Sequence, residues 1–254
     1  MVTPDVIATV VSAGQPRIHS PLLSPDGKWR AEVIIYDCVP VDTVDQNAFE
    51  ELRLVELGTS AEKVVDTQLR NCGGLGAAGL ESLLWSPNSR YLYYTRAREG
   101  VPDGCGYWWE RPIIRLDIVN HTSEQLSGGP WSPDKTKMAA WQWPAKELVI
   151  WQVNGGEFAR VSALKPDANI GPLAWSPDGR SIVYLQAELD CYPFGKTYVV
   201  RFDLSTLKQE LLLESEKPSW GSVTWESPNQ LKLSDENNIE WRYNLVTKKL
   251  ELKP

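Results

Sequence analysis

Histidine is scarce in this 254-residue chain, which has only His19 and His121. A Ser-His-Asp triad is therefore poorly supported, and the sequence has neither a Gly-x-Ser-x-Gly nucleophile turn nor a Walker loop. The four cysteines include no Cys-x-x-Cys pair, which argues against a zinc site. We accordingly assign no catalytic residue and expect no cofactor and no bound metal.

Basic runs and long apolar runs are also missing. The net charge is −7, and the longest run of Lys and Arg is Lys248-Lys249. Binding to nucleic acid or to an anionic membrane needs a basic footprint, so we expect neither partner. The apolar stretch Val6–Val11 is far shorter than the ~20 residues that span a bilayer, so we expect no membrane insertion. No signal-peptide pattern is visible, although a signal removed before Met1 stays an open alternative.

Ser-Pro, in contrast, recurs in phase with a hydrophobic residue before it and a strand-like run after it. The proline-to-proline intervals are 62, 46, 44 and 51 residues. The five copies are Leu23-Ser24-Pro25-Asp26-Gly27, Trp85-Ser86-Pro87-Asn88-Ser89, Trp131-Ser132-Pro133-Asp134-Lys135, Trp175-Ser176-Pro177-Asp178-Gly179 and Trp225-Glu226-Ser227-Pro228-Asn229. Four of the 12 tryptophans head these copies, and we expect them to pack between repeats.

Each copy has the chemistry of a turn between two strands. Serine can bond back to the backbone, proline presets φ, Asp or Asn suits the next position, and Gly completes a type I turn. An alternating run of aromatic and β-branched residues follows, and then two more strand-like runs joined by Gly, Asn, Ser or Thr. Each unit therefore reads as four antiparallel strands, a to d, with Ser-Pro at the a–b turn. Such units at a period of roughly 45 residues predict an all-β fold, a single five-bladed β-propeller.

The repeats also set the expected boundaries of the blades. Residues 1–17 are an N-terminal segment that we expect to add an outer strand or to clamp the seam between the first and last blades. The five blades are expected at about residues 18–72, 79–127, 128–165, 170–215 and 220–254.

The segment Trp175–Gln186, which contains Trp-Ser-Pro-Asp-Gly-Arg and then an alternating strand, resembles the TolB-type propeller repeat. That repeat is also found in the propeller domains of prolyl-oligopeptidase-like proteins. The resemblance covers about residues 18–254, with departures at Leu23, at the inserted Glu226 and at the second, third and fifth copies, which lack the Gly. It implies a propeller fold and a habit of binding proteins, and it transfers no catalytic residue.

Strand order places the b–c and d–a connections of every blade on one face, and these are the long ones. Function usually lies on long loops that a rigid scaffold holds, so this long-loop (top) face is the predicted binding surface. Exposed aromatics there suit a protein, peptide or sugar partner. The alternative, that the rings pack down to tie the loops to the blades, stays open. The candidate binding residues are Tyr107, Trp108, Trp109, Tyr192, Phe194 and Trp220.

All four cysteines fall in the same long loops: Cys38, Cys105 and Cys191 in b–c loops and Cys72 in a d–a loop. An even count in surface loops favours disulfides, which we expect to pair Cys38 with Cys72 and Cys105 with Cys191. Disulfides would place the protein outside the cytoplasm, in the periplasm or secreted. Four free thiols in a cytoplasmic protein is the alternative.

Two enzyme signals receive less weight. Gly74–Gly79 matches the Gly-x-Gly-x-x-Gly fingerprint, but that fingerprint requires a following helix, and here a strand, Leu80–Trp85, is expected. Five-bladed propellers can also be glycosidases that use carboxylates around the funnel. The carboxylates that could serve are Asp37, Glu81, Asp103, Glu110 and Asp190, whereas the turn acids Asp26, Asp134 and Asp178 lie on the opposite face.

The sequence thus predicts a monomeric, non-catalytic scaffold that binds a protein or peptide through its long-loop face. A carbohydrate-binding or glycoside-cleaving propeller is the second hypothesis, and a purely structural domain is the third.

Overall fold

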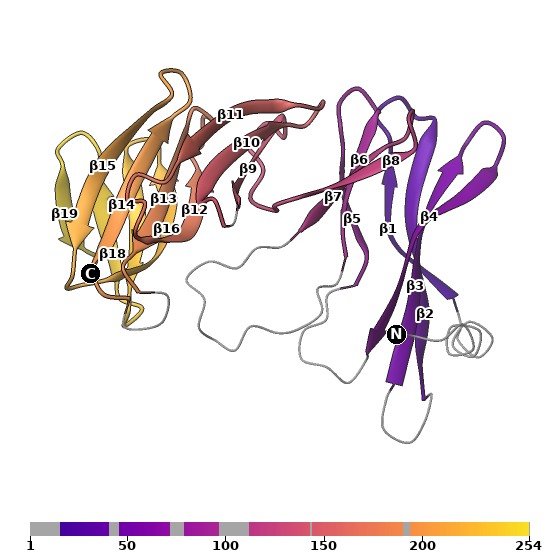
Figure 1. Ribbon diagram of the computed structural model, residues 1–254, viewed down its shortest axis with the longest axis horizontal. Helices are drawn as coiled ribbons and strands as arrows, with labels where there is room; N and C mark the ends of the chain where they lie inside the picture. The colour runs from indigo at the N-terminus through magenta and orange to yellow at the C-terminus, as the bar shows by residue number, and fades with distance from the viewer. Residues whose placement is uncertain are drawn as a thin grey trace. The chain divides into compact units, whose positions relative to one another are not determined.

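The computed structural model describes residues 16–40, 46–71, 79–96, 112–142, 144–189 and 194–253, without the side chains of 37–40, 46–48, 70 and 71. These residues form nineteen strands and no helix, so they contain no helix that could cross a membrane (Figure 1). The strands make five antiparallel sheets that follow one another along the chain. The predicted all-β fold of five propeller blades is confirmed.

The chain divides into two compact units, which are described separately. Unit 1 holds the first two blades, and in each blade the strands lie in chain order. Blade 1 consists of β1 (Pro16–Leu23), β2 (Trp29–Pro40), β3 (Gln46–Glu56) and β4 (Ala61–Asn71). Blade 2 consists of β5 (Glu81–Trp85), β6 (Tyr91–Thr95), β7 (Ile113–Asp117) and β8 (Thr122–Leu126).

Unit 2 holds the other three blades. Blade 3 consists of β9 (Lys137–Gln142), β10 (Glu147–Gln152) and β11 (Glu157–Ser162). Blade 4 consists of β12 (Asn169–Trp175), β13 (Ser181–Ala187), β14 (Thr197–Asp203) and β15 (Lys208–Ser215). Blade 5 consists of β16 (Trp220–Ser227), β17 (Gln230–Asp235), β18 (Glu240–Asn244) and β19 (Lys249–Leu252).

The first strand of blade 3 departs from the predicted pattern. It is reduced to a single bridge between Trp131 and Met138, beside the three-stranded sheet β9–β10–β11. The sequence before it explains why, because Pro130 has no N–H to donate to a ladder. Gly129 also approaches β9 so closely that a Cβ there would lie 1.9 Å from the carbonyl oxygen of Ala139.

The Ser-Pro turns form a repeated hydrogen-bonded unit. In blade 4 the Ser176 hydroxyl donates to Asp178 Oδ1 (2.6 Å) and accepts from the backbone N–H of Ser181 (2.9 Å). The backbone N–H of Gly179 closes the turn on the Ser176 carbonyl (2.9 Å). The same three bonds recur around Ser24, Ser86 and Ser132.

The fourth position of these turns has a positive φ whether or not it is glycine. Gly27 and Gly179 have φ of 69° and 67°, and Ser89 and Lys135 adopt 57° and 59°. The missing glycines of the second and third copies therefore leave the turn intact, at the cost of a less favoured backbone conformation. The fifth copy is different: β16 continues through Ser227, which pairs with Gln230, so a two-residue turn replaces the longer one.

The cores lie between consecutive blades of each unit. In β13, Ile182 and Tyr184 pack toward blade 3, while Val183 and Leu185 pack toward blade 5. This follows from the two-residue period of a strand, which sends successive side chains to opposite faces. In unit 1, residues of β2 and β3 form a third cluster with Trp85 and other residues of blade 2.

Candidate functional site

Each blade has two ends with different connections. The Ser-Pro and c–d turns are short and share one end, here called the turn end. The b–c and d–a connections share the other, the long-loop end, because consecutive strands are antiparallel. The predicted binding surface belongs to the long-loop ends. The long-loop ends of blades 4 and 5 contain the largest share of described residues.

Of the six predicted binding residues, Tyr107, Trp108, Trp109 and Tyr192 lie outside the described residues and stay predictions. Trp220 is fully buried, and its ring meets that of Trp241 edge-on, with centroids 5.9 Å apart and an interplanar angle of 79°. A ring without exposed surface cannot contact a partner, so the prediction for Trp220 is wrong. Phe194 is half-buried and packs on the same cluster. Trp220 thus roots its connection in the core, as the alternative expected, whereas binding by the half-buried Phe194 stays a prediction.

Asp235 organises the b–c turn of blade 5 beside these rings. Its Oδ2 accepts a hydrogen bond from Trp241 Nε1 (3.0 Å), and its Oδ1 accepts from the backbone N–H groups of Asn237 and Ile239 (both 2.9 Å). Burial alone would raise the pKa of Asp235, but these donors outweigh it and lower the pKa below its usual range. The carboxylate therefore stays ionised as the anchor of a loop.

Charged side chains surround this end of blade 4. Lys196 Nζ lies 3.2 Å from Glu214 Oε1, and this pairing raises the pKa of Lys196. Lys165 Nζ lies 4.9 Å from the centroid of the Tyr198 ring, and the Tyr198 hydroxyl donates to Glu188 Oε1 (3.4 Å). Such partly exposed pairs add little stability, and they leave polar groups available at the surface.

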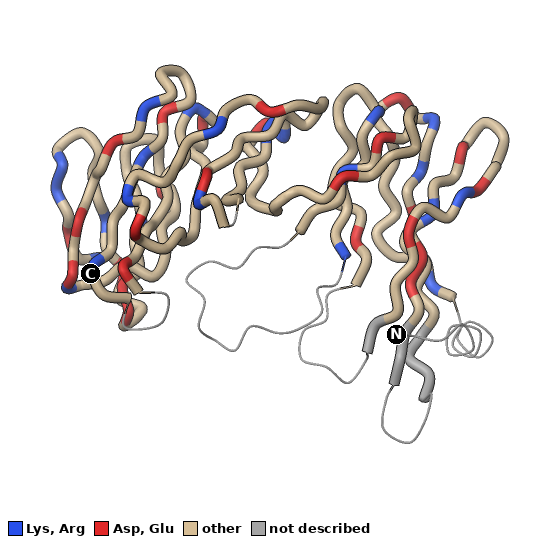
Figure 2. The backbone as a smooth tube through the Cα atoms, viewed as in Figure 1, with Lys and Arg blue, Asp and Glu red and all other residues tan. Residues whose placement is uncertain are grey.

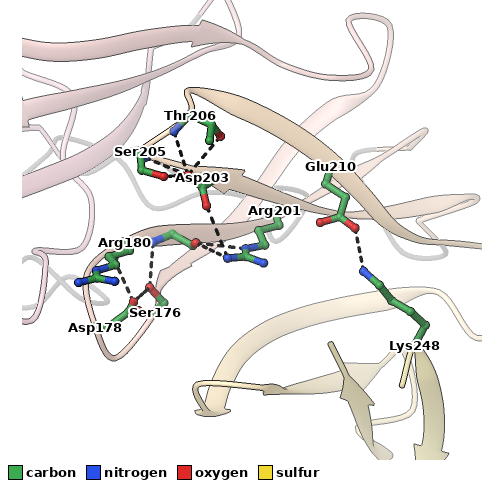
Figure 3. Close-up of polar contacts among 10 residues, drawn as sticks. Ser176, Asp178, Arg180, Arg201, Asp203, Ser205, Thr206, Glu210 and Lys248 are labelled. Carbon is green, nitrogen blue, oxygen red and sulfur yellow. Dashed lines mark hydrogen bonds and ion pairs between the residues drawn. The ribbon is translucent and has the colours of Figure 1, made fainter. Parts of the chain in front are cut away.

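At the turn end of blade 4 the polar side chains are used within the fold (Figure 3). Asp178 accepts from Ser176 and from the Arg180 N–H (3.0 Å), and Asp203 accepts from the Ser205 hydroxyl (2.6 Å). Arg201 donates to the Ser181 hydroxyl (3.0 Å). Lys248 Nζ lies 2.7 Å from Glu210 Oε1 and joins the outer hairpins of blades 4 and 5. As predicted for Asp26, Asp134 and Asp178, acids at this end form turns.

The glycine-rich segment ends where a strand begins. Gly79 and Leu80 lead directly into β5, so no helix follows the fingerprint, as predicted. The buried carboxylate of Glu50 accepts a hydrogen bond from the Leu80 N–H (2.7 Å). A Cβ on Gly79 would lie 2.2 Å from Glu50 Oε2, so a side chain there would require the Glu50 carboxylate to move.

Several predicted residues stay untested. Glu81 is exposed at the start of β5, while Asp103, Glu110, Asp190 and the side chain of Asp37 lie outside the described residues. The same holds for residues 1–15, for Cys72, Cys105 and Cys191, and for the side chain of Cys38. The carboxylate pair of a glycosidase, both disulfides and the closure strand therefore remain predictions.

Charge is evenly mixed along both units, with Lys and Arg interspersed among Asp and Glu (Figure 2). Within the described ranges, no three His, Cys, Asp or Glu side chains cluster in a way that could hold a metal ion. The described residues therefore form neither a strongly acidic nor a strongly basic site.

Three organising residues escaped the sequence prediction: Glu50, Asp235 and Trp241. The run Asp235–Asn238 between two strand-like segments is a readable turn signal for the second of these. Nothing local marks Glu50, because its partner Leu80 is 30 residues away.

Comparisons with known proteins add no conclusion to the architecture that the strands themselves show. No protein-family model and no curated protein matches the chain. Solved structures similar to it include TolB from Acinetobacter baumannii (16% identity, 92% of this chain and 53% of that chain, TM-score 0.41). Another is an oligogalacturonate lyase in complex with manganese (16% identity, 94% of this chain and 65% of that chain, TM-score 0.44). A third is a puromycin-hydrolysing peptidase of Mycobacterium tuberculosis (16% identity, 93% of this chain and 38% of that chain, TM-score 0.45). The chain thus spans about half of the TolB structure, and at these scores the likeness supports no conclusion about activity.

Proposed function

We propose that this chain is a non-catalytic scaffold that binds a protein or peptide through the long-loop ends of its blades. The difference between the two ends of a blade is the observation that carries the proposal. At the turn end, serine, aspartate and arginine side chains bond to one another and to the backbone.

At the long-loop end of blades 4 and 5, one buried ring and one partly buried ring hold the roots of the connections. Trp220 and Trp241 form the base, and Asp235 fixes the turn above Trp241. Half-exposed charges such as Lys196 and Glu214 lie around them. Rigid anchoring of loop roots lowers the entropy lost when loops order on a partner, which favours binding.

The proposal is tested with the two adjacent predicted binding residues Trp108 and Trp109. A double replacement, Trp108→Ala with Trp109→Ala, should remove a set of bound proteins that the unchanged chain retains from an extract. Val246→Ala is the matched control, because Val246 is 71% exposed on the c–d turn of blade 5, at the turn end. The bound sets are compared by quantitative mass spectrometry after capture on the tagged chain.

Equal recovery of every bound protein by the double variant and by Val246→Ala would contradict binding through these two residues. The variant must first show the same thermal unfolding as the unchanged chain, so that lost binding reports a lost surface.

A further inference from the structure

A cavity of about 250 Å³ lies between the two blades of unit 1, at their turn ends. One wall comes from β3, β4 and the start of β2, and the other comes from β7, β8 and the turn between them. The apolar part of the lining is formed by Trp29, Leu54, Val65, Leu116 and Ile118. The cavity is smaller than the ~300–1,000 Å³ of sites that hold drug-sized ligands, so it suits a compact group.

Two nitrogen-bearing side chains from different blades meet at this cavity. Lys63 Nζ, at the start of β4, lies 3.3 Å from His121 Nδ1, in the turn before β8. Among the described residues the Lys63 side chain forms no ion pair, and His121 is its one polar contact. A neutral imidazole nitrogen can accept from the ammonium group but cannot balance its charge.

The carboxylates at the same cavity already have donors. Glu62 pairs with Arg53, with Nη1 and Oε2 3.4 Å apart, and Glu56 accepts from the Thr59 hydroxyl (2.6 Å). The positive charge of Lys63 is thus the one at this cavity that lacks a carboxylate partner among the described residues. A ligand that brings its own anionic oxygen would supply it.

We propose that this cavity binds a compact apolar group that carries one terminal carboxylate. The carboxylate accepts a hydrogen bond from Lys63 Nζ beside His121, because charge-assisted bonds are the stronger ones. The apolar part lies against Trp29, Leu116 and Ile118, where it is removed from water. A free aliphatic or N-acylated acid and the C-terminal residue of a peptide share this chemistry. The site lies at the turn end and is independent of the surface proposed above.

The probes are N-acetyl-L-leucine and N-acetyl-L-leucinamide, which have the same apolar body and differ in charge. Titration of the isotope-labelled 254-residue chain should show the acid binding about tenfold more tightly than the amide, as expected for one charge-assisted contact. The shifted NMR signals should include those of Lys63, His121 and the Trp29 indole. Equal binding of acid and amide, or no binding of either, would overturn the proposal.

Variants assign the recognition to named residues. Lys63→Met should abolish the tenfold preference for the acid and leave binding of the amide unchanged. Lys28→Met is the matched control, because Lys28 is an exposed lysine of blade 1 that does not line the cavity. Ala61→Trp, at an exposed position of the lining, should block both probes without disturbing the core. If Lys63→Met binds the acid as tightly as Lys28→Met does, the assignment to Lys63 is wrong.

A second pair of probes separates the two sources of the ligand. A short peptide ending in leucine is titrated with a free and with an amidated C-terminus. Preference for the free peptide supports capture of a chain end, and binding of N-acetyl-L-leucine without either peptide supports a free acid.

Discussion

The indole Nε1 of Trp175 donates a hydrogen bond to the backbone carbonyl oxygen of Pro130 in the preceding blade, at a distance of 2.8 Å. The relationship recurs, because Trp225 donates to the Ala174 carbonyl (3.2 Å) and Trp85 donates to the Leu22 carbonyl (3.0 Å). In every case the acceptor lies two residues before the Ser of the preceding Ser-Pro turn. In blades 2, 4 and 5 the repeated tryptophan thus joins its own blade to the preceding blade by packing and by a directed bond.

Loss of this bond should destabilise unit 2. Trp175→Phe keeps an aromatic ring but removes the N–H donor, so the Pro130 carbonyl keeps only the bond from the backbone N–H of Ala139 (3.1 Å). We expect the free energy of unfolding to fall by about 0.5–1.5 kcal/mol, measured by urea denaturation. Phe158→Leu, at a 40% exposed ring on β11, is the control and should change stability little. Equal stability of the two variants would show that the indole N–H contributes nothing.

The Ser-Pro serine should matter in four copies and not in the fifth. Ser176→Ala removes the acceptor for the Ser181 N–H in a buried turn, which should cost about 1–3 kcal/mol of unfolding free energy. Ser227→Ala is a matched control, because Ser227 belongs to the same motif but lies in β16 next to a two-residue turn. A similar loss in both variants would mean that the hydroxyl bond is not the stabilising element.

Turn carboxylates should make stability depend on acid pH. The Ser205 hydroxyl and the Thr206 backbone N–H lower the pKa of Asp203 from 3.8 to about 2, and the Ser132 hydroxyl and Thr136 lower that of Asp134 in the same way. A lowered folded-state pKa gives stability that is present above the unfolded-state pKa of about 4 and is lost as pH falls toward about 2.

Asp203→Asn tests this dependence. The variant should be less stable than the unchanged chain at neutral pH, and the difference should shrink between about pH 4 and pH 2. Chemical denaturation at a series of pH values measures it. Parallel stability curves across that interval would contradict the linkage.

Gly79→Ala should lower the free energy of unfolding because the new Cβ meets Glu50, since Gly79 has no positive φ that would itself favour glycine. The added Cβ would lie 2.2 Å from Glu50 Oε2, a buried carboxylate that also accepts from Leu80. We expect a loss of about 1–3 kcal/mol in unfolding free energy. Gly58→Ala is the control, since a Cβ there meets nothing within 4 Å.

A double-mutant cycle sharpens this test. In a Glu50→Ala background, where the clash is absent, Gly79→Ala should cost much less than it does in the unchanged chain. Additive effects of the two replacements would show that Glu50 is not the cause.

Local chemistry explains how much of the fold was predictable. The turn bonds of Ser176 reach only to Asp178 and Ser181, so the pattern Ser-Pro-Asp is visible in a short stretch of sequence. The alternation in β13 is equally local, because successive side chains face opposite sides of a strand. These features sufficed to predict five antiparallel blades and the position of most strands.

The sites were less predictable because their partners are distant in sequence. The exposure of Trp220 depends on Trp241 in another strand, so a long-loop aromatic expected at the surface is buried. Likewise, Ser227-Pro228 looks like the other copies, yet the extension of β16 turns it into a tighter connection.

By itself the sequence determined the repeat, the turns and the strand order, because these rest on bonds between residues a few positions apart. The tertiary structure alone decided which distant residues meet. The pairs are Glu50 with Gly79, Trp175 with Pro130 and Lys63 with His121, and their members are 29 to 58 residues apart. The physical reason is that burial and unpaired charge are properties of the packed blades. A side chain acquires them only when another blade or connection is placed against it.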